Sequence, residues 1–205
     1  MGPYVALERE QLDEQIAQAA SDLSVDTRGE LPVFVSSTNL FLYIKKSITR
    51  CTVLTRSRTF FLLNKAFCDN LRKFASILSN KYPSPSTAAA VISLVPPSAS
   101  SSLLSGGTAN YRISSGYEIV ICHVINTCEY CSETIESLQD LIADKIDPKF
   151  KDQVDMTAEQ DAFQVVTAKW IKILVAGLER RLDGAYREMG SIHWGTMSIL
   201  GEESG

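Results

Sequence analysis

The stretch Ile121–Ile142, with the sequence ICHVINTCEYCSETIESLQDLI, decides the fold of this chain. Its apolar residues recur in steps of three, four or multiples of these, and acidic residues occupy the opposite side. The apolar positions are Ile121, Ile125, Cys128, Ile135, Leu138 and Ile142. This spacing is typical of a long amphipathic helix with one buried face, and it is not the pattern of an active-site loop.

Composition and length favour a globular chain that can bury a core. The chain has 205 residues, of which 45% are hydrophobic and 21% charged, and its mean hydropathy is close to zero. It contains no run near the ~18 uncharged apolar residues of a membrane span, and its N-terminus lacks the layout of a signal peptide. Five cysteines without the spacing of a disulfide framework favour a reducing compartment. We therefore expect a cytosolic domain, or one multi-helix segment of a larger subunit.

The N-terminal part of the chain predicts three helices that breakers separate. The first begins at Pro3, which suits a first helical turn, and the second is capped by Ser36, Ser37 or Thr38. The third covers about residues 59–80 and has the most regular helical period in the chain. The expected buried stripes of these helices are Tyr4, Leu7, Leu12, Ile16 and Leu23; Phe41, Ile44, Ile48 and Cys51; and Phe60, Leu63, Phe67, Leu71, Phe74 and Leu78.

The C-terminal part predicts two more long helices and a tail. A fourth helix is expected over about residues 115–145, with Pro148 as its stop. Thr157 and Gln160 form a predicted capping box for a fifth helix, and Gly184 is its predicted end. The expected stripe of the fifth helix is Phe163, Val166, Trp170, Ile173 and Leu178. From all five helices, the side chains that we single out as core packing are Phe60, Leu63, Phe67, Phe74, Ile125, Cys128, Ile135, Phe163 and Trp170.

Together these patterns predict an all-α fold, an elongated antiparallel bundle of about five helices. Residues 1–82 are expected to form a three-helix segment, and residues 113–205 a segment of two long helices and a C-terminal tail. Between them, residues 83–112 are rich in Ser, Pro and Gly and cannot bury enough apolar surface to fix their backbone, so they are expected to form a flexible loop. The two helical segments together should make one bundle.

Charge is distributed unevenly along the chain. The formal net charge of −4 argues against nucleic acid as a partner. Residues 31–82 nevertheless hold nine Lys or Arg against one acid, whereas residues 117–162 hold eleven Asp or Glu against three lysines. Two solvated helix faces are the simplest explanation, although the basic hairpin of residues 45–73 could also meet a charged partner or anionic lipid. Its candidate interaction surface is Lys45, Lys46, Arg50, Arg72 and Lys73.

The residue types that carry catalysis or bind metals do not form a convincing set. Cys128 and Cys131 make a CxxC pair, but the pair lies inside a predicted helix, away from the N-terminal turn that would stabilise a thiolate. His123 and His193 are the only histidines, too few for the usual zinc arrangements. We therefore interpret the cysteines as packing residues and expect no catalytic residue, no metal site, no cofactor and no enzyme activity.

Several short strings carry a resemblance to a known family. They are STNLFLYIKK at 37–46, INTCEYCSET at 125–134, KID at 145–147, MTAEQDAF at 156–163 and MGSIHW at 189–194. On these residues the chain resembles the C-terminal part of the vacuolar protein sorting-associated protein 53 family, a subunit of the Golgi-associated retrograde protein (GARP) complex. The NTxEYCxET string is the most specific, and the resemblance covers nearly all of the chain outside the 83–110 loop.

The resemblance implies a structural and interaction module of a multisubunit vesicle-tethering complex in retrograde endosome-to-trans-Golgi transport. It implies a helical rod of bundle or coiled-coil type, without catalytic residues or cofactor. The implied partners are sister subunits, with SNAREs or small GTPases as further partners and no nucleic acid. The implied location is peripheral, at the cytoplasmic face of trans-Golgi network and endosome membranes. A module that binds anionic membranes through the basic 45–73 hairpin stays open as the alternative.

Overall fold

The computed structural model describes residues 2–81 and 117–192. Within them lie five long helices, one short helix and one pair of two-residue strands, so the predicted all-α fold of five main helices is confirmed. The predicted 83–110 loop and the tail after residue 192 lie outside the described residues. The elements are α1 (Gly2–Ser21), β1 (Val25–Asp26), β2 (Val33–Phe34), α2 (Val35–Leu54), α3 (Arg58–Ser79), α5 (Tyr117–Lys145), α6 (Pro148–Lys151) and α7 (Thr157–Ser191).

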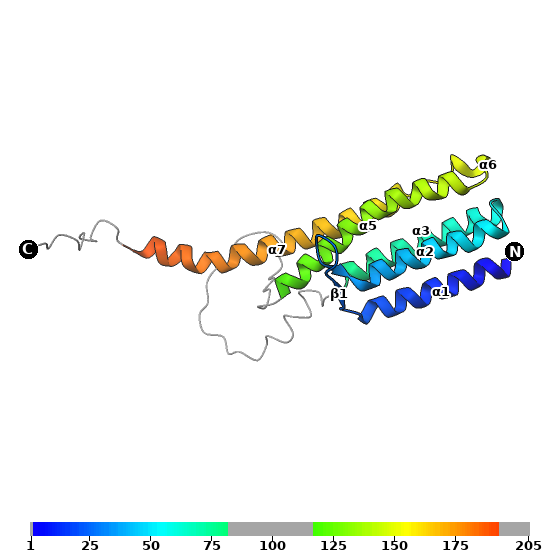
Figure 1. Ribbon diagram of the computed structural model, residues 1–205. Coiled ribbons are helices and arrows are strands. Elements are labelled where there is room, and N and C mark those ends of the chain that lie inside the picture. The colour runs from blue at the N-terminus through cyan, green and yellow to red at the C-terminus, as the bar shows by residue number, and fades with distance from the viewer. Residues whose placement is uncertain (1, 82–116, 193–205) are drawn as a thin grey trace, which may run out of the picture.

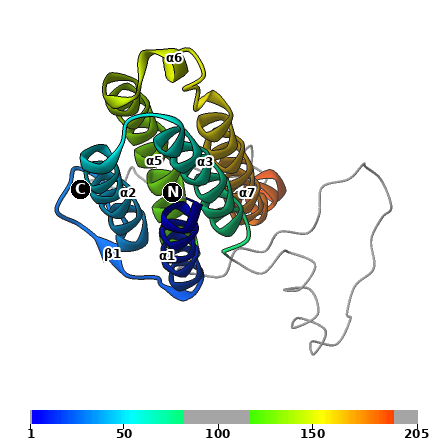
Figure 2. The ribbon, with the colours of Figure 1, turned by 90° about the vertical axis from the view of Figure 1, so that its right-hand side faces the viewer.

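The long helices lie side by side and form an elongated bundle (Figure 1). The α2–α3 turn, α6 and the start of α1 gather at one end, whereas α7 continues past the other helices at the opposite end (Figure 1). In the view along the bundle, α3 lies between α1 and α7, and α5 packs against α7 (Figure 2). The two strands pair antiparallel, with Val25 opposite Phe34, and they close the connection from α1 to α2.

The core is centred on α3, because this helix has neighbours on several sides. Its predicted stripe of Phe60, Leu63, Phe67, Leu71, Phe74 and Leu78 is completely buried. The Phe74 ring lies 6.3 Å from the ring of Phe163 on α7, measured between centroids. The indole Nε1 of Trp170 donates a hydrogen bond of 3.1 Å to the carbonyl oxygen of Leu78, near the end of α3. Since each fully buried Leu or Phe stabilises a fold by about 1.5–3 kcal/mol, this stripe is a main source of stability.

The string at 125–134 joins α5 to the start of α2. The hydroxyl of Thr127 accepts a 2.9 Å hydrogen bond from the backbone N–H of Phe34, and it donates to the carbonyl of His123 at 2.6 Å. Asn126 donates through Nδ2 to the carbonyl of Pro32 at 3.2 Å. The Tyr130 ring packs edge-on against Phe41 of α2, with centroids 5.9 Å apart. These residues therefore hold two segments together that lie about ninety residues apart in the sequence.

Three leucines that the helical period assigned to buried stripes are exposed, so those predictions were wrong. Leu7 is 57% exposed because the buried face of α1 starts at its neighbour Glu8 and continues through Leu12. Leu23 is 55% exposed because α1 ends at Ser21. Leu178 is 46% exposed because α3 ends at Ser79, and the α7 residue that bonds near this end is Trp170, eight positions before Leu178.

The predicted helix ends also need correction. α2 begins at Val35, so Ser37 lies in its first turn and donates its hydroxyl to the carbonyl of Phe34 instead of capping the helix. At the start of α7, the carboxylate of Asp155 accepts from the backbone N–H of Thr157 at 2.9 Å, which replaces the predicted capping box. Gln160, the other member of that box, donates to the carbonyl of Ser132 on α5.

Two predicted helix stops behave differently in the structure. Pro148 does not only follow the end of α5; it occupies the first turn of α6, behind an Asp147 side chain that accepts from the backbone N–H of Lys149. α7 does not end at position 184 but continues to Ser191, so the glycine at that position was wrongly read as a stop. An interior glycine lowers helix stability by about 1 kcal/mol without ending the helix.

Candidate interaction surfaces

Arg50, one of the five candidate surface cations, is engaged within the bundle by a buried carboxylate. Glu8 on α1 is 5% exposed, and its two oxygens accept hydrogen bonds from Arg50 Nε at 3.0 Å and Nη2 at 2.8 Å. The same carboxylate accepts from the hydroxyls of Tyr43 and Ser47, both at 2.8 Å. A single acid on α1 thus binds three side chains of α2, and this Glu8 cluster fixes the two helices against each other.

The chemistry of the Glu8 cluster is that of a stable ion pair and not of an acid–base catalyst. Burial by itself raises the pKa of Glu8, but the hydrogen bonds from Arg50, Tyr43 and Ser47 outweigh it and hold the pKa below its ordinary value. Burial and the hydrogen bond to Glu8 raise the pKa of Tyr43 to about 12. Glu8 therefore remains ionised and Tyr43 protonated across the physiological range.

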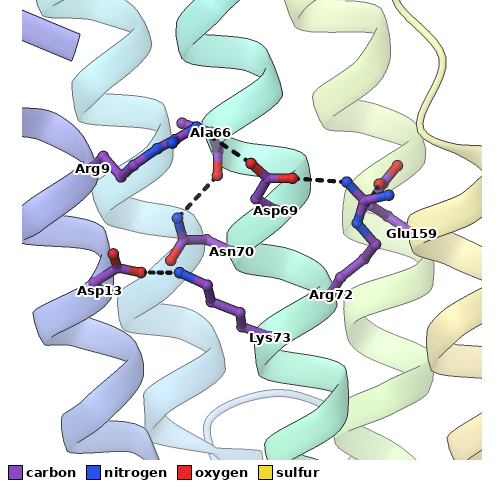
Figure 3. Close-up of polar contacts among 8 residues, drawn as sticks. All are labelled: Arg9, Asp13, Ala66, Asp69, Asn70, Arg72, Lys73 and Glu159. Carbon is purple, nitrogen blue, oxygen red and sulfur yellow. Dashed lines mark hydrogen bonds and ion pairs between the residues drawn. The ribbon is translucent and has the colours of Figure 1, made fainter. Parts of the chain in front are cut away.

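Arg72 and Lys73 of the predicted surface also contact acids of the bundle (Figure 3). Arg72 Nη2 lies 2.8 Å from Asp69 Oδ1, and Arg72 Nε lies 3.5 Å from a carboxylate oxygen of the buried Glu159 on α7. Lys73 pairs with Asp13 of α1. These pairs connect α3 to α7 and to α1, so both cations, although each is 51% exposed, take part in contacts between helices of the bundle.

Lys45 and Lys46 are placed differently from the other three candidates. Both are exposed on the outer face of α2, where they line a shallow depression with Thr49 and Arg50. Within residues 2–81 and 117–192, neither lysine is part of an ion pair. The structure thus divides the predicted basic surface into three cations that are about half exposed and pair with acids of the bundle, and two exposed lysines of α2 outside these pairs.

The cysteine pair lies in the core. Cys128 and Cys131 are fully buried on the face of α5 that packs into the bundle. Burial raises the pKa of the Cys128 thiol to about 12 and that of Cys131 well above its ordinary value. In the described parts of the chain, no group of three His, Cys, Asp or Glu side chains is arranged to hold a metal ion. At neutral pH both groups are thiols packed as small apolar side chains.

The remaining residues that we singled out for the core are positioned as follows. Phe60, Leu63, Phe67, Phe74, Ile135 and Phe163 are completely buried, and Trp170 is 5% exposed. Ile125 is only partly buried, and it packs against the edge of the core. It lies on α5 one residue beyond the buried Val124, which the predicted stripe did not include.

An exposed apolar stripe on the second half of α7 is the surface that the sequence analysis missed. Ile171, Val175, Leu178 and Leu182 are between 45% and 50% exposed and follow each other in steps of four, three and four. The pattern continues through Ala185, Met189 and Ile192. We call these seven apolar positions, from Ile171 to Ile192, the α7 stripe. Its spacing is that of the a and d positions of a coiled coil, which is the pattern that a second helix requires.

The chain was compared with known proteins. It is 33% identical to vacuolar protein sorting-associated protein 53 A of Arabidopsis thaliana over 205 residues, which cover 99% of this chain and 23% of that protein. Over its whole length the chain is thus similar to one segment of a vacuolar protein sorting-associated protein 53. It is also 26% identical to the Caenorhabditis elegans homolog of this protein over 103 residues, or 50% of this chain and 12% of that one.

These comparisons confirm the predicted resemblance to the family. The chain spans less than a quarter of the length of each relative. No family model matches it, and no solved structure does. In the part of the chain that the structure describes, none of the helices combines the length and the apolar character needed to cross a membrane.

Proposed function

We propose that the chain is a structural and interaction module of a multisubunit vesicle-tethering complex in retrograde endosome-to-trans-Golgi transport. Similarity to vacuolar protein sorting-associated protein 53 supports a role in protein sorting. The bundle suits a structural role because its long helices are packed along their length by a continuous core. The observation that carries the proposal is the α7 stripe, since it is an apolar helix face that the bundle itself leaves exposed.

The partner that the stripe fits best is an amphipathic helix of a sister subunit. Ile171, Val175, Leu178 and Leu182 are each about half exposed, so a second helix packed on them would bury the remaining apolar area. Charged residues lie beside the stripe, among them Glu179 and Glu188, and such positions set partner choice in coiled coils. SNAREs and small GTPases are further candidate partners.

The proposed location follows from the proposed partners. The chain would be held peripherally at the cytoplasmic face of trans-Golgi network and endosome membranes by the complex to which it binds. We propose no catalytic activity and no cofactor for it, because the buried thiols and the paired Glu8 carboxylate have packing and structural roles.

The proposal is tested by the double substitution Leu178→Gln and Leu182→Gln in the full-length protein. Both side chains are half exposed, so the bundle should fold normally, while a helix packed on the stripe would lose its central apolar contacts. We expect sister subunits to co-purify at a level at least tenfold lower, and retrograde cargo to return more slowly to the trans-Golgi network. The first effect corresponds to about 1.4 kcal/mol of binding free energy.

The matched control is Leu7→Gln with Val165→Gln, two residues that are 57% and 69% exposed and lie outside the stripe. This variant should leave co-purification and cargo transport unchanged. Equal co-purification with the stripe variant and the unsubstituted protein would show that the α7 stripe does not bind a subunit of the complex.

A further inference from the structure

The end of the bundle at the α2–α3 turn has an unusual surface composition. Residues 31–68 contain six Lys or Arg and no Asp or Glu. At the turn itself, the apolar residues Val53, Leu54 and Leu62 flank the cations Arg56 and Arg58 in the sequence. We call these five residues the tip. It lies at the far end of the bundle from the projecting part of α7 (Figure 1).

The apolar residues of the tip are exposed to an unusual degree. Val53 is 82% exposed, which exceeds every other large hydrophobic side chain in the described part of the chain, and Leu54 is 59% exposed. Leu62, one turn into α3, is 42% exposed. Single exposed apolar residues are common on protein surfaces, but three within ten residues at one turn make a local patch at the end of the bundle.

The cations of the tip do not serve the stability of the bundle. Arg58 is the first residue of α3, where the helix dipole disfavours a positive charge. Within residues 2–81 and 117–192, Arg56 and Arg58 are not part of any ion pair, and neither is Lys65 further along the same face of α3. Residues that break a local stability rule without compensation within the fold are expected at functional sites.

The tip is held rigidly by the neighbouring turn. The backbone N–H of Asp147 donates a 2.8 Å hydrogen bond to the carbonyl of Arg56. The ring of Phe61 stacks on Phe150 of α6, with centroids 5.0 Å apart and ring planes 10° from parallel. The patch therefore keeps its shape without a partner, and little conformational entropy is lost when it binds.

The charges on the neighbouring turn do not cancel those of the tip. Lys149 and Lys151 are exposed on α6, and Lys149 pairs with Asp147. Residues 144–155 as a whole contain three lysines and four Asp, a formal charge of −1. This turn therefore offsets one of the three positive charges of Arg56, Arg58 and Lys65, and an excess of positive charge remains.

We propose that the tip binds the surface of an anionic lipid bilayer. Val53 and Leu54 would enter the boundary between headgroups and acyl chains, and Arg56 and Arg58 would lie at the level of the lipid phosphates. A bilayer fits better than an acidic partner helix, because the apolar residues sit at a turn at the end of the bundle, whereas a helix needs a stripe or groove along which to pack. The site lies within the predicted 45–73 hairpin but uses other residues than its candidate surface, three of whose cations pair with acids of the bundle.

The test is co-sedimentation of the purified 205-residue chain with phosphatidylcholine vesicles that contain or lack phosphatidylserine. We expect binding only to the phosphatidylserine vesicles, weakened by added salt. Because each cation near an anionic leaflet contributes about fivefold to affinity, Arg56→Glu with Arg58→Glu should weaken binding by at least about 25-fold. Val53→Gln with Leu54→Gln should weaken it by about tenfold or more through loss of apolar burial.

The charge-matched control is Lys172→Glu with Arg187→Glu, which reverses two exposed cations on α7 far from the tip. This variant should bind vesicles within about twofold of the unsubstituted chain, apart from the general effect of net charge. The tip variants change exposed side chains, and their helix content and thermal midpoint, measured by circular dichroism, should match those of the unsubstituted chain.

Three results would overturn the proposal. One is no binding to phosphatidylserine vesicles at low salt. Another is an equal loss of binding in the tip variants and the control, which would indicate a diffuse charge effect. The third is tip-dependent binding to soluble polyglutamate but not to vesicles, which would make the tip a docking site for an acidic peptide.

Discussion

Replacing Glu8 with glutamine should destabilise the bundle in a way that depends on pH. The substitution keeps the shape of the side chain but removes the charge that accepts two hydrogen bonds from Arg50 and two more from Tyr43 and Ser47. Hydrogen bonds to a charged group each contribute about 1.5–3 kcal/mol, but the Arg50 side chain is 46% exposed and water screens part of its interaction. We expect a loss of about 2 kcal/mol in the free energy of unfolding at pH 7.

The pH dependence identifies the charge as the cause. Because the pKa of folded Glu8 lies below its ordinary value of 4.5, its stabilising effect is complete above that value. As the pH falls from about 4.5 through the lower folded pKa, the proton taken up by Glu8 removes the effect. The stabilities of the unsubstituted chain and the Glu8→Gln variant should therefore differ most at neutral pH and converge in acid.

Urea titrations followed by circular dichroism at pH 7 and pH 3 measure this difference. At pH 7 the thermal midpoint should also fall by about 4–8 °C, given about 2–4 °C per kcal/mol for a chain of this size. Glu10→Gln, an exposed glutamate on the same helix, is the control and should change stability by less than about 0.5 kcal/mol. A Glu8→Gln variant as stable as the control at pH 7, or a difference that persists unchanged at pH 3, would refute the reasoning.

Three further substitutions and one labelling experiment test the packing. Phe67→Ala removes a fully buried ring from the centre of α3 and should cost about 3–5 kcal/mol in urea unfolding; a cost below about 1 kcal/mol would place the ring at a surface. Leu178→Gln, at a position that is 46% exposed, should change the stability of the isolated chain by less than about 0.5 kcal/mol, and a large loss would show that the α7 stripe is covered within the chain itself. Thr127→Val leaves the buried N–H of Phe34 without its acceptor and should cost about 1–3 kcal/mol, which thermal melting would detect. In the folded chain, a maleimide should label the exposed Cys122 within minutes while Cys131 reacts only on unfolding, and mass spectrometry of the labelled peptides would reveal early reaction of Cys131 if its burial were incomplete.

The sequence predicted buried residues best for the helices in which the spacing of apolar residues alone identifies the buried face. The stripe of α3 has a buried residue at every third or fourth position because the helix is surrounded by neighbours, so the pattern and the packing agree. α5 shows the same agreement, apart from Ile125 at the edge of the core. Periodicity alone, however, does not tell where a neighbouring helix ends. For this reason Leu178 on α7 was assigned to the core, although the core does not extend to this position of the helix.

Contacts between residues far apart in the sequence could not be predicted either, because local patterns do not indicate which helices become neighbours. Glu8 and Arg50 are 42 residues apart, and nothing in either local sequence indicates that they meet. Lys73 and Asp13 are 60 residues apart, so a lysine that pairs within the bundle looks the same in the sequence as one that is free. The predicted cap of α7 was wrong because another polar residue lies close to it in the sequence. The Asp155 carboxylate accepts from both the backbone N–H and the hydroxyl of Thr157, so this hydroxyl is engaged, and the N–H of Gln160 bonds to the carbonyl of Met156.

The length of α7 has a consequence for its dynamics. The last part of this helix, toward Ser191, has few tertiary contacts, and an added Cβ at Gly190 would meet open space, so packing does not require a glycine there. Glycines at positions 184 and 190 each weaken a helix by about 1 kcal/mol, and few contacts are present to offset that loss. The amide hydrogens of residues 184–191 should therefore exchange with deuterium far faster than those of α3. A helix that settles on the α7 stripe would slow that exchange, so the protein would gain order at this end only when it is assembled.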